Sequence, residues 1–259
     1  MNKITSSQNP KIKEILKLRK TKQRKKTDLF IIEGAQELGM VIKSGIQISN
    51  LFYCADYLKD KSFLSQLHCD IYELDKNTFN KISLRENPDG ILVLAKPKDM
   101  FLNDIKLSKN PFLLILESIE KPGNLGAIFR TADACGVDCI IICEPKTDIY
   151  NPNVIRSSLG TIFTNKIVIC KNSEIFSWLK KNNIKSFATT PNTDILYTRA
   201  DFSGAIAITI GTEHEGLSTE WLKSADYKIK IPMKGKIDSL NASVSAAIIL
   251  FEASRQREK

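Results

Sequence analysis

The stretch Ile231-Pro-Met-Lys-Gly-Lys-Ile-Asp-Ser-Leu-Asn-Ala-Ser243 changes its pattern in the middle. Apolar residues alternate from Ile229 to Met233, which predicts a β-strand over 227–233. A Lys-Gly pair then breaks the alternation, and a helical apolar pattern begins beside Asn241. A helix start presents free backbone N–H groups, so this arrangement predicts a ligand-binding loop. Ser239 and Asn241 are equally suited to capping the helix and tying the loop.

The helix that follows carries an apolar stripe surrounded by small side chains. The stripe consists of Leu240, Val244, Ala247, Ile248 and Phe251, and the small residues are Ala242, Ser243, Ser245 and Ala246. Small side chains allow another element to approach closely. The sequence leaves open whether that element is the protein core or a second subunit.

A second loop lies upstream, at Gly123-Asn-Leu-Gly-Ala-Ile-Phe-Arg-Thr-Ala-Asp-Ala-Cys-Gly136. Asn124 is expected to cap a helix that ends at Gly136. Gly126 and Arg130 are four residues apart and therefore share one helix face. The missing side chain at Gly126 leaves room for a bulky group, toward which Arg130 would direct its guanidinium. An ordinary helix with a surface arginine explains the pattern equally well.

A third loop follows a buried strand, at Ile210-Gly-Thr-Glu-His-Glu-Gly-Leu217. Gly211 and Gly216 bracket an acidic turn, and Ser218 is expected to cap the next helix. Ligands of open α/β sheets bind at such strand ends. A turn of this kind is a weak signal by itself.

Two domains are predicted from the change in pattern along the chain. Residues 1–95 alternate between helix and strand periods, with a basic helix near the N-terminus and a helix near 59–67. Residues 96–110 are polar and charged and are interpreted as a linker. Residues 111–259 contain continuous apolar strands separated by helical stretches, which predicts an α/β domain with a mostly parallel sheet.

The net charge of +9 is concentrated in one segment. Residues 11–26 hold nine lysines and arginines against one glutamate, so this segment supplies nearly the whole excess. Such a concentration favours contact with a phosphate backbone, and a solvated helix face is the alternative. The predicted RNA contacts are Lys20, Lys22, Arg24, Lys25 and Lys26.

The six cysteines include no Cys-x-x-Cys pair, so we expect reduced core thiols and no metal site. No apolar run reaches the roughly 18–20 residues of a membrane span, and the start of the chain has no signal-peptide pattern. The sequence therefore predicts a soluble, cytoplasmic protein.

The three loops, in this order and spacing, resemble the signature motifs of the SpoU/TrmH family of RNA ribose 2′-O-methyltransferases in the SPOUT class. Asn151-Pro-Asn-Val-Ile-Arg-Ser-Ser-Leu-Gly160 is similar to a further family segment, and the match spans 111–252. The resemblance implies S-adenosylmethionine as cofactor, a homodimer and a C-terminal trefoil knot. It also implies that residues 1–95 form a substrate-binding domain with a ribosomal-protein-like α/β fold.

The resemblance also assigns residues to roles. The implied cofactor-binding positions are Thr189, Gly211, Ile231, Met233 and Leu240, and the implied catalytic positions are Asn124, Arg130, Glu213, Ser239 and Asn241. A guanidinium has a pKa above about 12, so we expect Arg130 to bind the phosphate beside the target ribose, with a phosphate oxygen receiving the proton. His214 is the alternative base, but the family pattern leaves its position unspecified.

The expected function is 2′-O-methylation of RNA, in 23S ribosomal RNA. The alternatives are a transfer-RNA 2′-O-methyltransferase and a non-catalytic RNA-binding ribosome-assembly factor. Glu213, Ser239 and Asn241 could be catalytic or structural, and the sequence does not separate these roles.

Overall fold

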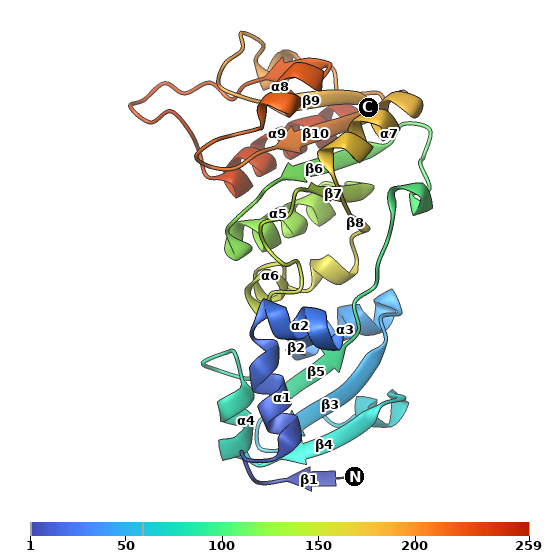
Figure 1. Ribbon diagram of the computed structural model, residues 1–259, viewed down its shortest axis with the longest axis vertical. Coiled ribbons are helices and arrows are strands. Elements are labelled where there is room, and N and C mark those ends of the chain that lie inside the picture. The colour runs from blue at the N-terminus through green and yellow to red at the C-terminus, as the bar shows by residue number, and fades with distance from the viewer. Residues whose placement is uncertain (1, 59, 259) are drawn as a thin grey trace. The chain divides into compact units, whose positions relative to one another are not determined.

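The computed structural model describes residues 2–58 and 60–258. Three residues lie outside the described ones. Met1 and Lys259 are the outer ends of the two predicted domains, and Lys59 is the start of the helix predicted near 59–67. The chain forms two compact units, each with its own sheet (Figure 1). One comprises Met1–Lys98 and Asp148–Thr164, and the other comprises Asp99–Thr147 and Asn165–Lys259. The functional boundaries at residues 95 and 111 stay a prediction.

The first unit is built on a mixed five-stranded sheet. Its strand order is β1 (Asn2–Ile4), β4 (Asp70–Leu74), β3 (Ile48–Cys54), β5 (Ile91–Ala95) and β2 (Phe30–Glu33). Strands β1 and β3 run parallel to β4, whereas β5 is antiparallel to β3 and β2. Helices α1 (Pro10–Leu18) and α4 (Lys76–Ile82) bury their apolar sides in one core cluster with the sheet, and α3 (Ala35–Ser44) also contacts β2.

Two local predictions in this unit were wrong. The basic segment forms two helices, α1 and α2 (Thr21–Thr27), because Lys20 adopts an extended conformation between them. The helix predicted near 59–67 is a short 3-10 helix, η1 (Ser62–Gln66). Helix α4 was not predicted, although Asp75 marks its start by accepting a hydrogen bond from the Thr78 backbone N–H at 3.0 Å.

The excursion 148–164 packs with the N-terminal residues rather than with the second sheet. It contains α6 (Pro152–Ser157) and η3 (Thr161–Phe163). The rings of Phe30 and Tyr150 stack with their centroids 4.3 Å apart. Gly160 lies so close to α3 that an added Cβ would stand 2.9 Å from the Met40 sulfur. The Asn151–Gly160 motif is therefore fixed to the first unit by side-chain packing.

The second unit contains a six-stranded sheet, and every strand pair in it is parallel. Its order is β11 (Tyr227–Ile229), β9 (Lys185–Thr189), β10 (Ile206–Ile210), β6 (Phe112–Glu117), β7 (Cys139–Cys143) and β8 (Ile167–Cys170). The predicted α/β class with a mostly parallel sheet is confirmed. The trefoil knot stays a prediction.

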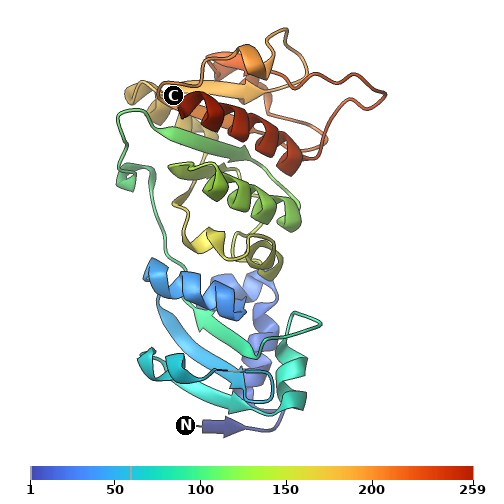
Figure 2. The same ribbon diagram turned by 180° about the vertical axis from the view of Figure 1, so that it is seen from behind.

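Helices cover both faces of this sheet, as its apolar strands require. Helices α5 (Pro122–Ala134) and α9 (Ala242–Arg257) lie side by side on one face (Figure 2). Helices α7 (Asn172–Lys181) and α8 (Thr219–Ser224) cover the other face (Figure 1). Two short 3-10 helices, η2 (Leu102–Asp104) and η4 (Tyr197–Arg199), lie in connections.

Strand β11 ends at Ile229, four residues before the predicted end. Lys230 still forms an isolated bridge to Leu196, but Pro232 has no N–H with which to continue a ladder. Residues 231–241 consequently form a loop that projects from the sheet before α9 begins (Figure 1).

Two helix predictions in this unit also need correction. Helix α5 begins at Pro122 with Lys121 as its N-cap, so Asn124 lies inside the first turn and does not cap the helix. Helix α9 buries Ala242, Ala246, Ile249, Leu250 and Ala253. The sequence-derived stripe faces elsewhere: Val244 is 46% exposed and Phe251 is 54% exposed.

All six cysteines are free, and five of them are buried. Burial raises the pKa of Cys135 to about 11 and that of Cys139 to about 12, so both remain thiols near neutral pH. Among residues 2–58 and 60–258, no three or more His, Cys, Asp or Glu side chains are grouped so that they could hold a metal ion. None of the described helices is long and apolar enough to cross a membrane.

Candidate functional site

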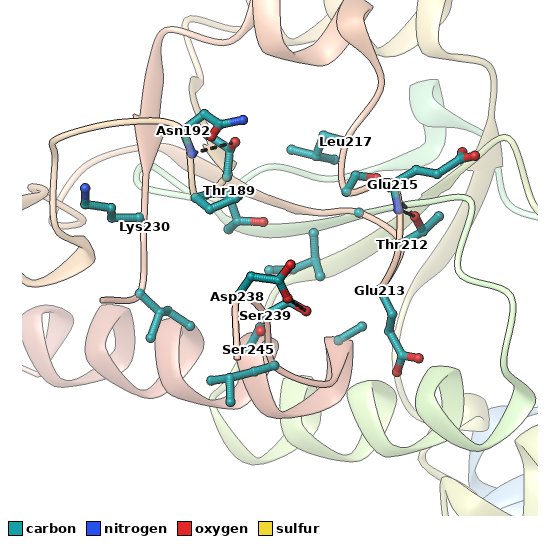
Figure 3. Close-up of a pocket in the computed structure, with 18 of the residues that line it drawn as sticks. Thr189, Asn192, Thr212, Glu213, Glu215, Leu217, Lys230, Asp238, Ser239 and Ser245 are labelled. Atoms are coloured by element: carbon teal, nitrogen blue, oxygen red, sulfur yellow. Dashed lines mark hydrogen bonds between the residues drawn. The ribbon is translucent and has the colours of Figure 1, made fainter. Parts of the chain in front are cut away.

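A cavity of about 330 Å³, here called the main cavity, opens at the carboxyl edge of the parallel sheet. Loops after β9, β10 and β11 form it, together with the start of α9 (Figure 3). The five sequence-derived cofactor positions all line it: Thr189, Gly211, Ile231, Met233 and Leu240. Its size falls in the range of about 300–1,000 Å³ that is usual for ligand pockets.

The main cavity combines apolar side chains with unused backbone groups. Ile210, Leu217 and Ile249 contribute to its apolar walls. Among the described residues, the 231–240 segment forms no backbone–backbone hydrogen bond. Its N–H and C=O groups are therefore available to a ligand, as are those of a helix start.

The turn after β10 is closed by its two glycines. The Thr212 N–H donates to the Gly216 carbonyl at 3.0 Å, and Gly216 has a φ of +68°. A Cβ added at Gly211 would lie 2.3 Å from the Gly216 carbonyl carbon and oxygen. Only glycine at position 211 allows this approach, which holds the 212–215 turn against the main cavity.

Glu213 joins the three sequence loops through hydrogen bonds. Its Oε1 accepts hydrogen bonds from the Asn124 amide and, at 2.7 Å, from the Asn241 amide. Asn241 Nδ2 also lies 3.2 Å from Asn124 Oδ1, and Asn241 Oδ1 accepts from the Ser243 N–H at 2.9 Å to cap α9. The Glu213 side chain is directed toward α5 (Figure 3).

Lys121 is a member of this cluster that sequence reasoning missed. Its ammonium donates a hydrogen bond to Glu213 Oε2 and forms an ion pair with it. The Lys121 side chain is 62% exposed and that of Glu213 is 15% exposed. The hydrogen bond from Lys121 outweighs burial and lowers the pKa of Glu213, which is therefore ionised near neutral pH. We call Lys121, Asn124, Glu213 and Asn241 the Glu213 network.

A second cavity of about 210 Å³, here called the side cavity, lies against the same turn. Its lining residues are Ile119, Glu120, Lys121, Asn124, Thr212, Glu213, His214, Glu215 and Ala242. The turn 212–215 and Ala242 line both cavities. A ligand in the main cavity and a ligand in the side cavity would therefore lie on either side of the Glu213 network.

The remaining candidate residues occupy different positions. Ser239 lines the main cavity, and its hydroxyl donates to Asp238 Oδ1 at 3.0 Å. Arg130 is exposed on α5 and lines neither of the two cavities. His214 is exposed and lines both. The structure therefore brings Asn124, Glu213, Ser239 and Asn241 to the cavities and leaves Arg130 further along α5.

The basic segment divides into exposed and buried residues. Lys20, Lys22, Lys25 and Lys26, called the four exposed lysines below, all face solvent. Arg24 is only 4% exposed, and its Nε donates to Asp148 Oδ2 at 2.7 Å. Its other nitrogens donate to the Leu18 carbonyl at 2.8 Å and to the Thr21 hydroxyl at 2.9 Å. Arg24 therefore does not present its charge at the surface, unlike the other four predicted RNA contacts.

The second unit thus combines a parallel sheet covered on both faces, a backbone-lined cavity at the carboxyl edge and the Glu213 network, and solved SPOUT methyltransferases share its fold. Residues 111–251 match the SpoU rRNA Methylase family, and residues 9–93 match the MRM3-like substrate binding domain. The chain belongs to the SpoU rRNA methylase family.

Relatives match the chain over nearly its full length. A 23S rRNA (guanosine(2553)-2′-O)-methyltransferase of Bacillus subtilis, RlmP, is 27% identical over 97% of this chain and 98% of its own length. A solved RNA 2′-O ribose methyltransferase is 37% identical, with a TM-score of 0.87, covering 99% of this chain and 100% of its own. An AdoMet-bound rRNA methyltransferase from Sinorhizobium meliloti is 28% identical, with a TM-score of 0.90, covering 98% of this chain and 97% of its own.

Proposed function

We propose that this protein transfers a methyl group from S-adenosylmethionine to a ribose 2′-hydroxyl of 23S ribosomal RNA. The observation that carries the proposal is the Glu213 network, which joins all three loops between two adjoining cavities. Family membership and the full-length match to a 23S rRNA 2′-O-methyltransferase support the same reaction and substrate.

The main cavity fits S-adenosylmethionine. Apolar walls suit the adenine ring, and the unused backbone groups of 231–240 suit its ring nitrogens and ribose hydroxyls. We assign this contact surface to Thr189, Gly211, Ile231, Met233 and Leu240. When bound, S-adenosylmethionine supplies a methyl group activated by its positive sulfonium.

The side cavity is the place that we assign to the acceptor ribose. Asn124 and Asn241 hold the Glu213 carboxylate, and together these groups fix the wall that the two cavities share. Correct placement of two reactants contributes up to about 7–11 kcal/mol to lowering a barrier. We infer that these residues act mainly by positioning, and that Ser239, which is hydrogen-bonded to Asp238, shapes part of the main cavity wall.

Arg130 is assigned to the phosphate beside the target ribose. Arg130 lies six positions after Asn124, or about 9 Å further along the axis of α5. An RNA strand that leaves the side cavity along this helix would bring a phosphate to the Arg130 guanidinium. The 2′-hydroxyl would then lose its proton to an oxygen of that phosphate, since the arginine itself stays protonated.

The N-terminal domain of residues 1–95 is assigned to RNA binding through the four exposed lysines. They lie on the basic segment without an acidic partner among the described residues. Phosphate contacts of this kind give affinity without reading sequence. Arg24 contributes indirectly, because it fixes α2 against the 148–164 excursion.

We further propose a homodimer formed through α9. Val244, Ile248 and Phe251 lie at helical spacing on one face, and two of them are about half exposed. An exposed apolar stripe of this kind is typical of a subunit interface. Sedimentation of Phe251→Ser should reveal monomers, and an unchanged mass would contradict this interface.

Because ribosomal RNA is the substrate, we place the protein in the cytoplasm.

The test of the proposed function is methyl transfer from radiolabelled S-adenosylmethionine to ribosomal and transfer RNA, followed by mapping of 2′-O-methyl sites. Label in 23S rRNA supports the proposal. Label confined to transfer RNA would make the protein a tRNA 2′-O-methyltransferase. No incorporation into any RNA, with RNA binding retained, would favour a non-catalytic ribosome-assembly factor.

A further inference from the structure

We propose that Lys121 is a positioning residue for the reaction: it holds the Glu213 carboxylate in the orientation that closes the wall between the two cavities. The proposal rests on the proposed function and extends it to a residue that the three sequence motifs did not assign. It follows from the contacts of Lys121, the position of Glu213 and the two cavities that share this wall.

Both oxygens of the Glu213 carboxylate have hydrogen-bond partners. Glu213 Oε1 is occupied by the amides of Asn124 and Asn241, whereas Oε2 accepts from Lys121. The two oxygens are therefore held by different partners. Without Lys121, Oε2 would have no charged partner and the side chain could turn about its last bond, because that rotation is broad and poorly restricted.

Lys121 connects two protein segments that are distant in the chain. Lys121 precedes α5, and Glu213 lies in the turn after β10, so the pair links two loops that are 92 residues apart in the chain. The turn 212–215 lines both cavities. A shift of this turn would change the distance between the two ligands, and misplacement by about 1 Å costs about a hundredfold in rate.

Lys121 also supplies the positive charge beside the Glu213 carboxylate. Glu120, His214 and Glu215 also line the side cavity, and Asp238 lines the main cavity. Lys121 is the lysine or arginine closest to Glu213 among the described residues and the largest cause of its lowered pKa. If Lys121 is removed, burial remains, and the pKa of Glu213 rises. A protonated, neutral Glu213 would be a weaker acceptor for the Asn124 and Asn241 amides than the carboxylate is.

The experiment compares Lys121→Met and Lys121→Arg with the wild-type chain. The methionine keeps an apolar stem of nearly the same length without the charge, and the arginine restores a donor. We expect Lys121→Met to lower kcat about ten- to hundredfold with an unchanged Kd for S-adenosylmethionine. We also expect the acidic limb of its pH profile to move to higher pH, and Lys121→Arg to recover both properties in large part.

The matched control is Lys171→Met, because Lys171 is the exposed N-cap of α7 in the same unit. This control should leave kcat and the pH profile unchanged. A Lys121→Met variant with an unmoved acidic limb would overturn the proposal, even if its overall rate fell. That result would mean that Lys121 serves only the start of α5.

A second measurement decides the proposal independently of catalysis. The carboxyl carbon of Glu213, identified with Glu213→Gln, is titrated by ¹³C NMR in the wild type and in Lys121→Met. The wild-type carboxyl should titrate below its ordinary value of 4.5, and the variant should titrate higher. Identical titrations would refute the role of Lys121. A wild-type chain that methylates no RNA would refute the proposed function, while the titration would still test the contact.

Discussion

Replacing Arg24 with methionine separates a structural role from an RNA contact. The Arg24 side chain is 4% exposed and forms a salt bridge with Asp148, whose side chain is 14% exposed. The same guanidinium donates to two backbone carbonyls, of Leu18 and Arg19. Removing one member of a buried ion pair costs about 3–5 kcal/mol, because the remaining charge is left without its partner.

We expect Arg24→Met to lower the free energy of unfolding by about 3 kcal/mol, the lower end of this range. Asp148 keeps a hydrogen bond from the Tyr150 N–H at 3.0 Å, and its partial exposure lets water reach the freed oxygen. A loss of about 3 kcal/mol moves a urea midpoint by about 1–3 M, since m is about 1–3 kcal/mol per molar urea. Both tryptophans, Trp178 and Trp221, lie in the second unit, so unfolding of the first unit should be followed by far-UV circular dichroism.

Lys25→Met is the control, because Lys25 is exposed on the same helix. It should leave the urea midpoint unchanged and reduce the salt dependence of RNA binding. The structural reasoning would be refuted if Arg24→Met and Lys25→Met unfolded at the same urea concentration. It would also fail if folded Arg24→Met lost RNA affinity with a smaller salt slope, since that pattern marks a direct phosphate contact.

Three further predictions concern RNA and cofactor. Replacing the four exposed lysines with glutamine should flatten the salt dependence of RNA affinity by roughly 0.7–0.9 log units per lost phosphate contact; an unchanged slope would mean that they are only solvated. Arg130→Ala should nearly abolish methylation while calorimetry shows intact S-adenosylmethionine binding, and substantial residual turnover would exclude the assigned role. Gly211→Ala should weaken S-adenosylmethionine binding by about ten- to hundredfold, because its Cβ meets the Gly216 backbone. Gly204→Ala, which meets nothing within 4 Å, is the control, and equal affinities in the two variants would contradict this account.

Helix α9 shows that the period of apolar residues does not always identify the buried face of a helix. The helix is apolar around most of its circumference, so two stripes fit a period of 3.6 residues. The sequence favoured the stripe with Val244 and Phe251, yet the chain buries the one with Ala246 and Leu250. Helix α9 packs beside α5, and the pattern of one helix does not contain the information on which face that packing buries.

The sequence by itself determined the class of the second domain and the chemistry of its loops. Continuous apolar strands separated by helices require a parallel sheet, and such a sheet gathers its carboxyl-end loops at one edge. The resemblance to the SpoU/TrmH family assigned Thr189, Gly211 and Met233, which are far apart in the chain, to one cofactor site, and all three line the main cavity.

Only the tertiary structure decided which charged groups meet. Arg24 and Asp148 are 124 residues apart, and Lys121 and Glu213 are 92 residues apart. A lysine or arginine has the same local pattern whether it faces solvent or a carboxylate, because the partner comes from a distant segment. The folded chain thus separates Arg24 from the four exposed lysines beside it and adds Lys121 to the Glu213 network.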